Sequence, residues 1–198
     1  MNKLIIIGAG GHGRVAADIA ELMGYDDISF LDDRSNCDVN VIGTTNDITK
    51  YAATSDFFVA IGNPVIRKKF FDELKINGAR IVRLIHPSAI VARSAILGDG
   101  ILIAAGAVVG VNAIVEDGAI VNTLSSIDHD CVLKTFSHIS GGAHMVGGTH
   151  IDSFSFVGVG ATIVGDVCAG CFIGAGAVVA KSITESGTYV GVPARKIK

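Results

Sequence analysis

Residues 97–121 read LGDGILIAAGAVVGVNAIVEDGAIV, and every sixth residue of this stretch is aliphatic. The same period extends from Ile85 to Ile163, where each sixth position is aliphatic or Met, and the residue two places earlier is small in all but one hexad. The sixfold positions are Ile85, Val91, Leu97, Ile103, Val109, Val115, Val121, Ile127, Leu133, Ile139, Met145, Ile151, Val157 and Ile163. A period of six fits neither a helix, at about 3.6 residues, nor an ordinary strand, at about 2. It indicates the hexapeptide repeat of a β-solenoid.

The solenoid is expected to be a parallel β-helix with three sides. If three hexads complete one coil of about 18 residues, the repeat makes about five coils, each raising the stack by about 4.8 Å. In each hexad the aliphatic residue and the small residue point inward, and the residue between them points outward. The period slips by two residues after Ile163 and resumes at Val167, which predicts a shorter side near Asp166.

The first 84 residues predict a small Rossmann-like α/β half-domain. Short apolar runs predict strands at 3–7, 28–31, 57–61 and 80–84, and amphipathic or polar stretches predict helices at 14–23, 45–53 and 65–77. This order implies a parallel sheet with right-handed crossovers. We therefore expect a mixed fold, with an α/β domain at 1–84 and a β-helix domain at 85–198, whose C-terminal tail, beginning at Tyr189 beyond Lys181, leaves the prism.

Charge and cysteine content narrow the possible functions. A net charge of −3 and a pI near 6.0 give no basic surface for a nucleic acid. The apolar start of the chain is interrupted at Gly8, so we expect a cytoplasmic protein without membrane insertion. Free thiols are expected at Cys37, Cys131, Cys168 and Cys171. The Cys168-x-x-Cys171 spacing has no second pair and no suitably spaced His, which favours small residues lining a turn over a metal site.

A glycine-rich loop follows the first strand. Gly8, Gly10 and Gly13 fit the pattern G-x-G-x-x-G between a strand and a helix, and Asp32 and Asp33 follow about 20 residues later, where an acid would meet a ribose hydroxyl. Glycines let backbone N–H groups approach a diphosphate closely. Because the second mononucleotide-binding half is missing, a nucleoside diphosphate carrying something other than nicotinamide is the better expectation.

Three polar residues near this loop are further candidates. His12 either donates a hydrogen bond to a phosphate or merely caps the helix. Asn63 and Arg67 follow the third strand, at the carboxyl edge where ligands of such sheets bind. Arg67 is equally well explained as a solvated charge on a helix.

Histidines are concentrated on the predicted solenoid. His138, His144 and His150 each precede an inward aliphatic residue, so they point outward, and six-residue steps place them on different faces rather than in a metal ladder. His129 lies in a corner between Asp128 and Asp130. A carboxylate beside an imidazole makes it a stronger base if the corner lets the two side chains meet, but the segment is equally explained as a polar corner. Ser125 and Cys131 lie in the inward column, which argues against a nucleophilic role.

Taken together, these stretches resemble the sugar acyltransferases of the left-handed β-helix superfamily, in particular the PglD/NeuD group and its N-acetyltransferases for UDP-linked 4-amino sugars of the bacillosamine pathway. The similarity covers essentially the whole chain. The stretches that carry it are Gly8-Ala-Gly-Gly-His-Gly13, Leu31-Asp32-Asp33, Ile61-Gly-Asn63, Asn122 to Cys131, Phe136-Ser-His138 and Gly191-Val-Pro-Ala194.

The resemblance implies a homotrimer that binds acetyl-CoA between subunits, without a metal, while the nucleotide sugar is held by the N-terminal domain. His129 matches the general base and Asp130 its acidic helper, where the bacillosamine enzyme has Glu. Other positions match binding residues: His138, Gly147 and Val159 for acetyl-CoA, Asn122 near the reacting amine, and Gly11, His12, Gly13, Asp32, Asp33, Gly62 and Asn63 for the nucleotide sugar. The rearranged segment 163–175 leaves the far end of the CoA groove undefined.

The expected activity is direct acetyl transfer from acetyl-CoA to the amine of a nucleotide-linked 4-amino-4,6-dideoxy sugar, with UDP as the first choice of nucleotide. Two alternatives stay open. One is an O-acetyltransferase acting on sialic acid or a related sugar, and the other is a non-catalytic scaffold that binds a nucleotide sugar or NAD.

Overall fold

The computed structural model describes residues 3–34 and 39–198, so Cys37 lies outside the described residues. The chain divides into two compact units, Met1–Pro87 and Ser88–Lys198. Each unit has its own core and is described separately.

Unit 1 is built on a parallel sheet with the strand order β3-β2-β1-β4-β5. Its strands are β1 (Lys3–Ile7), β2 (Asp27–Leu31), β3 (Val41–Gly43), β4 (Asp56–Val59) and β5 (Arg80–Ile81), followed by β6 (Leu84–Ile85). Its helices are α1 (Gly11–Leu22), the 3₁₀ helix η1 (Thr45–Asp47), α2 (Ile48–Tyr51) and α3 (Pro64–Ile76). The core around Ile5, Ile7, Leu31 and Phe57 is fully buried, which explains why the central strands are almost wholly apolar.

Two details of unit 1 differ from the sequence prediction. The segment between the strand predicted at 28–31 and the helix predicted at 45–53 contains a further strand, β3, which pairs with the end of β2. The strand expected at 80–84 is divided into β5 and β6. The start of α3 agrees with the prediction: the Asn63 side chain accepts hydrogen bonds from the amides of Val65 and Ile66 at 3.0 and 3.1 Å, and Pro64 occupies the first turn.

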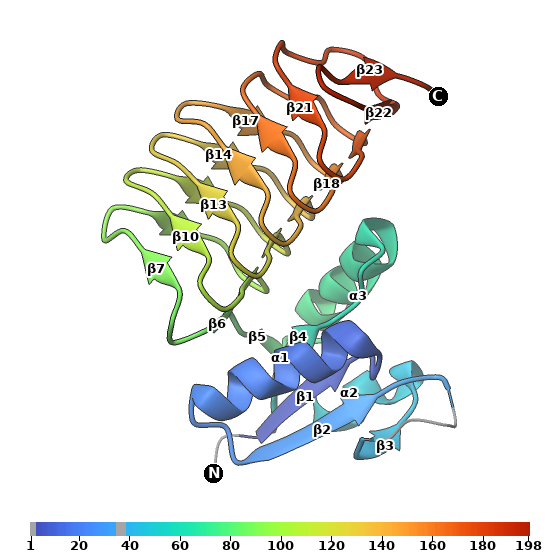
Figure 1. Cartoon of the computed structure of the whole chain (residues 1–198). Coiled ribbons are helices and arrows are strands. Elements are labelled where there is room, and N and C mark those ends of the chain that lie inside the picture. The colour runs from blue at the N-terminus through green and yellow to red at the C-terminus, as the bar shows by residue number, and fades with distance from the viewer. Residues whose placement is uncertain (1–2, 35–38) are drawn as a thin grey trace. The chain divides into compact units, whose positions relative to one another are not determined.

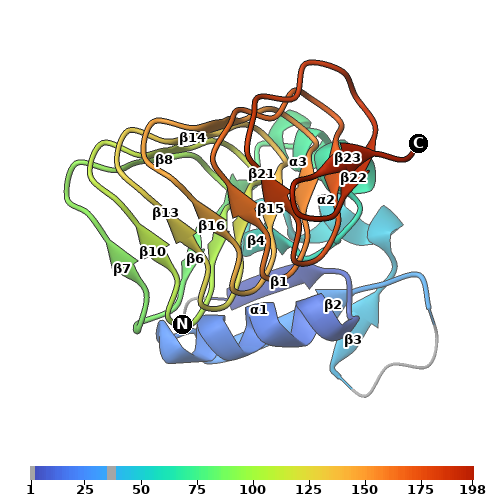
Figure 2. The ribbon, with the colours of Figure 1, turned by 45° about the horizontal axis from the view of Figure 1, so that its top comes forward.

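Unit 2 is a three-sided parallel β-helix (Figures 1 and 2). The first face carries β9 (Leu102–Ile103), β12 (Ile120–Val121), β15 (His138–Ile139), β18 (Phe156–Val157), β20 (Phe172–Ile173), β22 (Thr188–Val190) and β23 (Arg195–Lys196). The second face carries β7 (Ile90–Val91), β10 (Val108–Val109), β13 (Ser126–Ile127), β16 (His144–Met145), β19 (Thr162–Ile163) and β21 (Val178–Val179). The third face carries β8 (Ile96–Leu97), β11 (Ile114–Val115), β14 (Val132–Leu133) and β17 (His150–Ile151).

The pairing register confirms the 18-residue coil. Val108 pairs with Ser126, and Ser126 pairs with His144. The inward positions Ile127 and Met145 are buried, whereas the outward residue His144 is exposed. The three histidines of β15, β16 and β17 lie on three different faces, as predicted.

The coil near Asp166 is shorter, as the phase slip predicts. Thr162 pairs with Val178, a step of 16 residues, and Val167 forms isolated bridges to Ile151 and Ile183. The prediction of a tail that leaves the prism at Tyr189 is wrong. Tyr189 pairs with Ile173 in β20, because β22 continues the first face, and β23 then folds back antiparallel to it.

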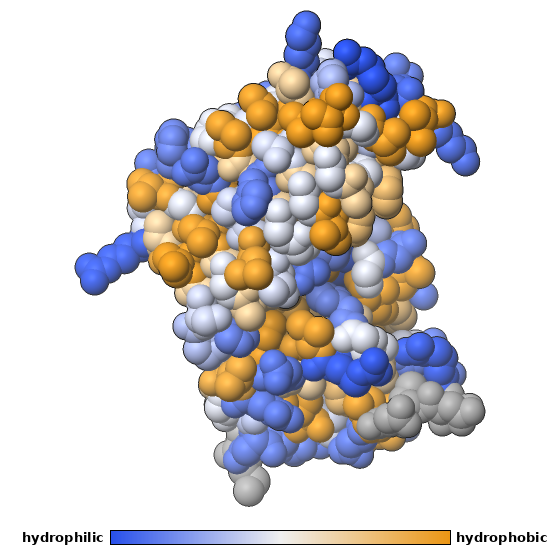
Figure 3. All heavy atoms as spheres, viewed as in Figure 1, coloured by the Kyte–Doolittle hydropathy of each residue, from blue (hydrophilic) through white to orange (hydrophobic). Residues whose placement is uncertain are grey.

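No helix in residues 3–34 or 39–198 is long and apolar enough to cross a membrane. Figure 3 shows hydrophobic side chains on the outside of the β-helix among pale and blue ones. Ile90 and Ile96 of unit 2 are among the exposed hydrophobic residues, at 66% and 62%.

Ile127→Ala is expected to lower the free energy of unfolding by about 2–5 kcal/mol, because it removes buried methyl groups from a stack that cannot collapse around the cavity. Denaturant titration followed by circular dichroism measures the change. Ile76→Ala is the matched control, since this side chain is 85% exposed and its loss should cost less than about 0.5 kcal/mol. Equal effects of the two substitutions would contradict the assignment of the inward column.

Candidate active site

His129 lies in the corner that joins the second face to the third, between β13 and β14. Its Nδ1 is 2.8 Å from Oδ2 of Asp130. Neighbouring side chains of a regular strand point apart, but Asp130 has a positive φ of 57°, and this turn brings the two side chains together. The corner therefore supplies the geometry that an imidazole and carboxylate pair needs.

Neighbouring coils hold this pair in place. The Asp130 amide donates to the Val111 carbonyl at 2.9 Å, and Nδ2 of Asn112 donates to Oδ1 of Asp130 at 3.1 Å. Asn112, 18 residues before Asp130, has the same φ of 57°. The sequence analysis missed Asn112, although its position one coil before Asp130 could have identified it.

Hydrogen bonds and charge set the protonation of the pair. The hydrogen bond to Asp130, together with the negative charge of Asp128, raises the pKa of His129 above its ordinary value. The hydrogen bonds from His129 and Asn112 lower the pKa of Asp130. Asp128 also accepts a hydrogen bond from the His129 amide at 2.7 Å. With Asp130 on Nδ1, Nε2 is the ring nitrogen left to face a substrate.

Gly147 lies directly against the imidazole of His129. A Cβ at this position would collide with Nε2 of the ring and would lie 2.6 Å from Cε1 and 2.9 Å from Cδ2, closer than real Cβ atoms approach. The following amide, of Gly148, donates to the His129 carbonyl at 2.8 Å. The structure thus places Gly147, a predicted CoA-groove residue, where the absence of a side chain makes room for the imidazole.

Asn122 and His138 form a second group on a different edge. Asn122 begins the corner between the first and second faces, and its Nδ2 is 3.3 Å from Nε2 of His138 in β15. The His138 ring makes an edge-to-face contact with Phe156, with centroids 5.0 Å apart. Val159, 62% exposed, lies in the same corner two coils further along. Within one chain, the second face separates this group from His129.

The inward residues of these corners have structural roles. Ser125 is buried and donates to the Asn122 carbonyl at 2.6 Å, and Cys131 is buried with its thiol 3.2 Å from the Val146 carbonyl. Both positions agree with the prediction that they point into the prism.

Unit 1 contains a cleft of about 450 Å³ above the glycine loop, lined by Gly10, Gly11, His12, Asp33, Arg34 and Gly62 among others. The first intrahelical hydrogen bond of α1 runs from the Arg14 amide to the Gly10 carbonyl, so the amides of residues 11–13 have no helical acceptor. A Cβ on Gly8 would lie 2.9 Å from the Ala60 carbonyl oxygen. The loop is therefore built for a close anionic group at a helix N-terminus.

The two predicted acids of this cleft are engaged by the protein. Asp32 is buried and accepts hydrogen bonds from the Ala9 amide at 2.7 Å and from Arg34, whose guanidinium holds the pKa of Asp32 far below its usual range. Asp33 is exposed and accepts from the amide and hydroxyl of Thr45, both at 2.9 Å. Asp32 thus fixes the glycine loop, and Asp33 is the acid at the rim.

Three further residues of unit 1 take defined roles. Asn63 caps α3, so its side-chain oxygen is already an acceptor for two amides. The alternative that Arg67 is a solvated charge is wrong, because Arg67 is 1% exposed and donates to the carbonyls of Ile61 and Gly62 at 2.7 and 2.9 Å. Burial and the nearby Arg67 lower the pKa of His12 to about 4, which keeps this imidazole neutral near pH 7.

Among the described residues, no group of three or more His, Cys, Asp or Glu side chains is arranged to hold a metal ion.

Comparison with known proteins places this geometry in a family. Residues 3–74 match the model of the PglD N-terminal domain. A stretch of 108 residues is 30% identical to the UDP-N-acetylbacillosamine N-acetyltransferase of Bacillus subtilis (strain 168), and this match spans half of the present chain and half of that relative.

Solved structures match over the full chain. The acetyltransferase domain of PglB from Neisseria gonorrhoeae FA1090, in complex with acetyl coenzyme A, is 42% identical, with a TM-score of 0.95 and complete coverage of both chains. PerB from Caulobacter crescentus, in complex with CoA and GDP-perosamine, is 31% identical, with a TM-score of 0.96 and coverage of 100% of this chain and 98% of that one. They confirm the predicted fold class, a small α/β half-domain followed by a left-handed parallel β-helix. The chain belongs to the PglD-type family of acetyl-CoA-dependent sugar N-acetyltransferases.

Gly147→Ala is expected to displace the His129 ring and break its hydrogen bond to Asp130, so the pKa of His129 should fall toward its ordinary value. Titration of the imidazole by NMR measures this shift. Gly141→Ala is the control, because its Cβ would meet only the Thr123 carbonyl oxygen, at 3.3 Å, on the other edge. An unchanged titration of His129 in Gly147→Ala would show that the ring does not depend on the missing side chain.

Proposed function

We propose that the protein transfers the acetyl group of acetyl-CoA to the 4-amine of a nucleotide-linked 4-amino-4,6-dideoxy sugar. The observation that carries the proposal is the His129–Asp130 pair, in which a carboxylate 2.8 Å from Nδ1 orients the imidazole and increases its basicity. The similarity to proteins described as an N-acetyltransferase of a UDP-linked sugar and as a complex with CoA and GDP-perosamine supports it.

In the proposed mechanism, the sugar amine attacks the thioester carbonyl while Nε2 of His129 takes up one amine proton. The tetrahedral intermediate collapses to the amide and expels the CoA thiolate, which receives the proton from the imidazolium. The net products are one N-acetylated sugar and one CoA thiol, and no acyl-enzyme forms. A positioned base of this kind contributes about 10²–10⁴ in rate, and the proximity of amine and thioester contributes the rest together with backbone donors to the oxyanion.

The nucleotide is assigned to the cleft of unit 1. The free amides at the start of α1 would hold the diphosphate, and the neutral His12 would donate one more hydrogen bond. Asp33 is the acid available to the nucleoside, Gly62 lines the same cleft, and Asn63 follows it directly in the chain. UDP is our first choice, and the GDP-perosamine complex of PerB makes GDP the specific competitor.

A homotrimer is proposed because the two groups of the β-helix lie on different edges of one chain. In a ring of three copies, the His129 edge of one copy can face the Asn122 and His138 edge of the next, with acetyl-CoA between Gly147 and Val159 of two copies. The second face would then turn toward the threefold axis. The outward residues of this face include no Asp, Glu, Lys or Arg, and the core of a protein interface is likewise poor in charged residues. These outward residues are Ile90, Val108, Ser126, His144, Thr162 and Val178.

An acceptor panel separates this proposal from its alternatives. With acetyl-CoA, UDP- and GDP-linked 4-amino sugars should give amide product, whereas a hydroxyl acceptor such as sialic acid should not. Thermal stability should rise with acetyl-CoA, because a ligand of the native state stabilises it, and not with NAD. A shift with NAD alone would favour the scaffold.

His129→Ala is expected to lower kcat by about 10²–10⁴-fold with little change in KM for acetyl-CoA, since only the base is lost. Steady-state kinetics with the amino-sugar nucleotide measures both constants. Asp130→Asn should be milder, and the ascending limb of its pH–rate profile should move to lower pH, because Asp130 raises the pKa of His129. Near-normal turnover of His129→Ala would remove the assignment of the base.

Mixed trimers test the shared site. Asn122→Ala and His129→Ala chains should each be nearly inactive alone, but trimers reassembled from equal amounts should regain about a quarter of the sites, those with an intact edge from each variant. The control replaces the His129→Ala chain by the double variant, which offers no intact Asn122 edge and should restore nothing. Absence of recovery in the first mixture would place both groups in a site within one chain.

A further inference from the structure

The third edge of the β-helix, between the third and first faces, carries a pair of thiols. Cys168 and Cys171 flank the turn that leads from Val167 into β20, and their Sγ atoms are 3.6 Å apart. Both thiols are free in the structure. This edge carries neither His129 nor Asn122, so the thiol pair is separate from the proposed active site.

The turn between the two cysteines is bridged by a side-chain hydroxyl group instead of a backbone hydrogen bond. In other corners the backbone closes on itself, as where the Ala107 amide donates to the Ala104 carbonyl at 3.1 Å. Here Oγ of Ser155 donates to the Cys168 carbonyl at 3.0 Å and accepts from the Cys171 amide at 3.2 Å. The backbone of this turn can therefore change its conformation without breaking a hydrogen bond between the Cys171 amide and the Cys168 carbonyl.

The two thiols differ in access. Cys171 is 2% exposed, and its thiol lies 3.7 Å from the Glu185 carbonyl. Cys168 is partly exposed and lines a cleft of about 480 Å³ on the third face, together with Lys134, His150 and Ser182. A small reagent can therefore reach Cys168 first, and Cys171 is shielded behind it.

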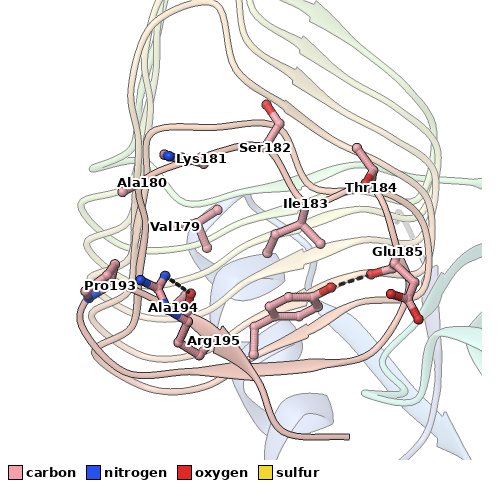
Figure 4. A pocket seen from close by; sticks show the side chains of 11 residues that line it. Val179, Ala180, Lys181, Ser182, Ile183, Thr184, Glu185, Pro193, Ala194 and Arg195 are labelled. Atoms are coloured by element: carbon pink, nitrogen blue, oxygen red, sulfur yellow. Dashed lines mark hydrogen bonds between the residues drawn. The ribbon is translucent and has the colours of Figure 1, made fainter.

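A second cavity is lined by Glu185, the residue whose carbonyl Cys171 approaches. It has a volume of about 390 Å³ and lies at the C-terminal end of the prism, lined by Lys181, Glu185, Tyr189 and Arg195 among others (Figure 4). The Tyr189 hydroxyl donates to the Glu185 carbonyl at 2.8 Å, the same carbonyl that Cys171 approaches. The Glu185 carbonyl is thus a shared neighbour of the Cys171 thiol and the Tyr189 hydroxyl.

We propose that Cys168 and Cys171 form a redox modification site that closes reversibly to a disulfide with a low-molecular-weight disulfide as oxidant. The Cys168 thiolate attacks one sulfur of the oxidant, forming a mixed disulfide and releasing one small thiolate. The Cys171 thiolate then attacks Sγ of Cys168 and expels the second. The two protein thiols lose two electrons and two protons, and the oxidant becomes two small thiols.

The geometry permits this closure. The ends of a β-turn lie within about 7 Å of each other, inside the range that a disulfide spans. The sulfur atoms must approach from contact distance to about 2.05 Å, which side-chain rotation and the adjustable turn can supply. Burial and the neighbouring thiol raise the pKa of Cys171 to about 11, so the second step is expected to be slow near pH 7 and faster in alkaline solution.

The test uses the full chain with Cys37→Ser, treated with glutathione disulfide under native conditions and then analysed by intact mass and peptide mapping. The parent should lose the mass of two hydrogen atoms, with the linkage mapped to Cys168 and Cys171, and dithiothreitol should reverse it. Cys171→Ser should stop at one glutathione adduct on Cys168. Cys168→Ser should stay unmodified, because Cys171 is buried. The closure rate should rise about tenfold per pH unit between about pH 8 and 10.

The proposal would be overturned if the parent chain kept both thiols, or stopped at the glutathione adduct, at every pH. It would also be overturned if the mapped disulfide involved Cys131. Peptide mapping of the parent decides this even if a variant fails to fold, which melting followed by circular dichroism would reveal. The unlinked parent, mapped in parallel without oxidant, is the reference for the mass change.

Discussion

The 18-residue register of the β-helix is the constraint on which the His129 corner depends. It places each residue beside its counterpart one coil away, so that a hydroxyl of Ser94 accepts from the Asn112 amide at 3.0 Å and Asn112 in turn reaches Asp130. Nothing within a single hexad could hold Asp130 in this way. The repeat therefore does more than bury aliphatic side chains, because it aligns polar groups into columns that fix the orientation of an imidazole.

In the proposed function, the two units have different tasks, recognition of the nucleotide in unit 1 and chemistry in unit 2. Unit 1 offers unpaired amides at a helix start and a rigid loop, in which Asp32 is committed to Ala9 and Arg34. Unit 2 offers an activated imidazole on one edge and an amide with a second imidazole on the next. A cleft suited to a diphosphate does not determine which sugar or other group the diphosphate carries. A basic imidazole can accept a proton from either an amine or a hydroxyl. Selectivity must arise from the contacts made by the bound sugar.

Periodicity predicted the β-helix well because a repeated pattern averages over local exceptions, and the inward and outward positions followed from it. Single features were harder. β3 is only three residues long, so its pattern is too short to distinguish from a loop. Arg67 donates to carbonyl groups of the loop just before α3, a contact back across the start of the helix that helical spacing does not encode. Tyr189 lies beyond the repeat, yet it pairs with β20 because the open end of the prism offers free backbone groups. Similarly, the sequence placed His129 beside Asp130, but only the turn geometry shows that their side chains meet.

The two-residue deficit near Asp166 shows how a chain of this kind tolerates changes in length. A deletion within the central coils would move every later residue out of its column, so that Asn112 and Gly147 would no longer flank the same corner. The deficit instead falls after Gly147, where the coils that hold the imidazole are already complete. Homologous chains should accordingly differ in length by whole coils of 18 residues in the part before Asp166. Differences of fewer residues than a coil should occur only after it.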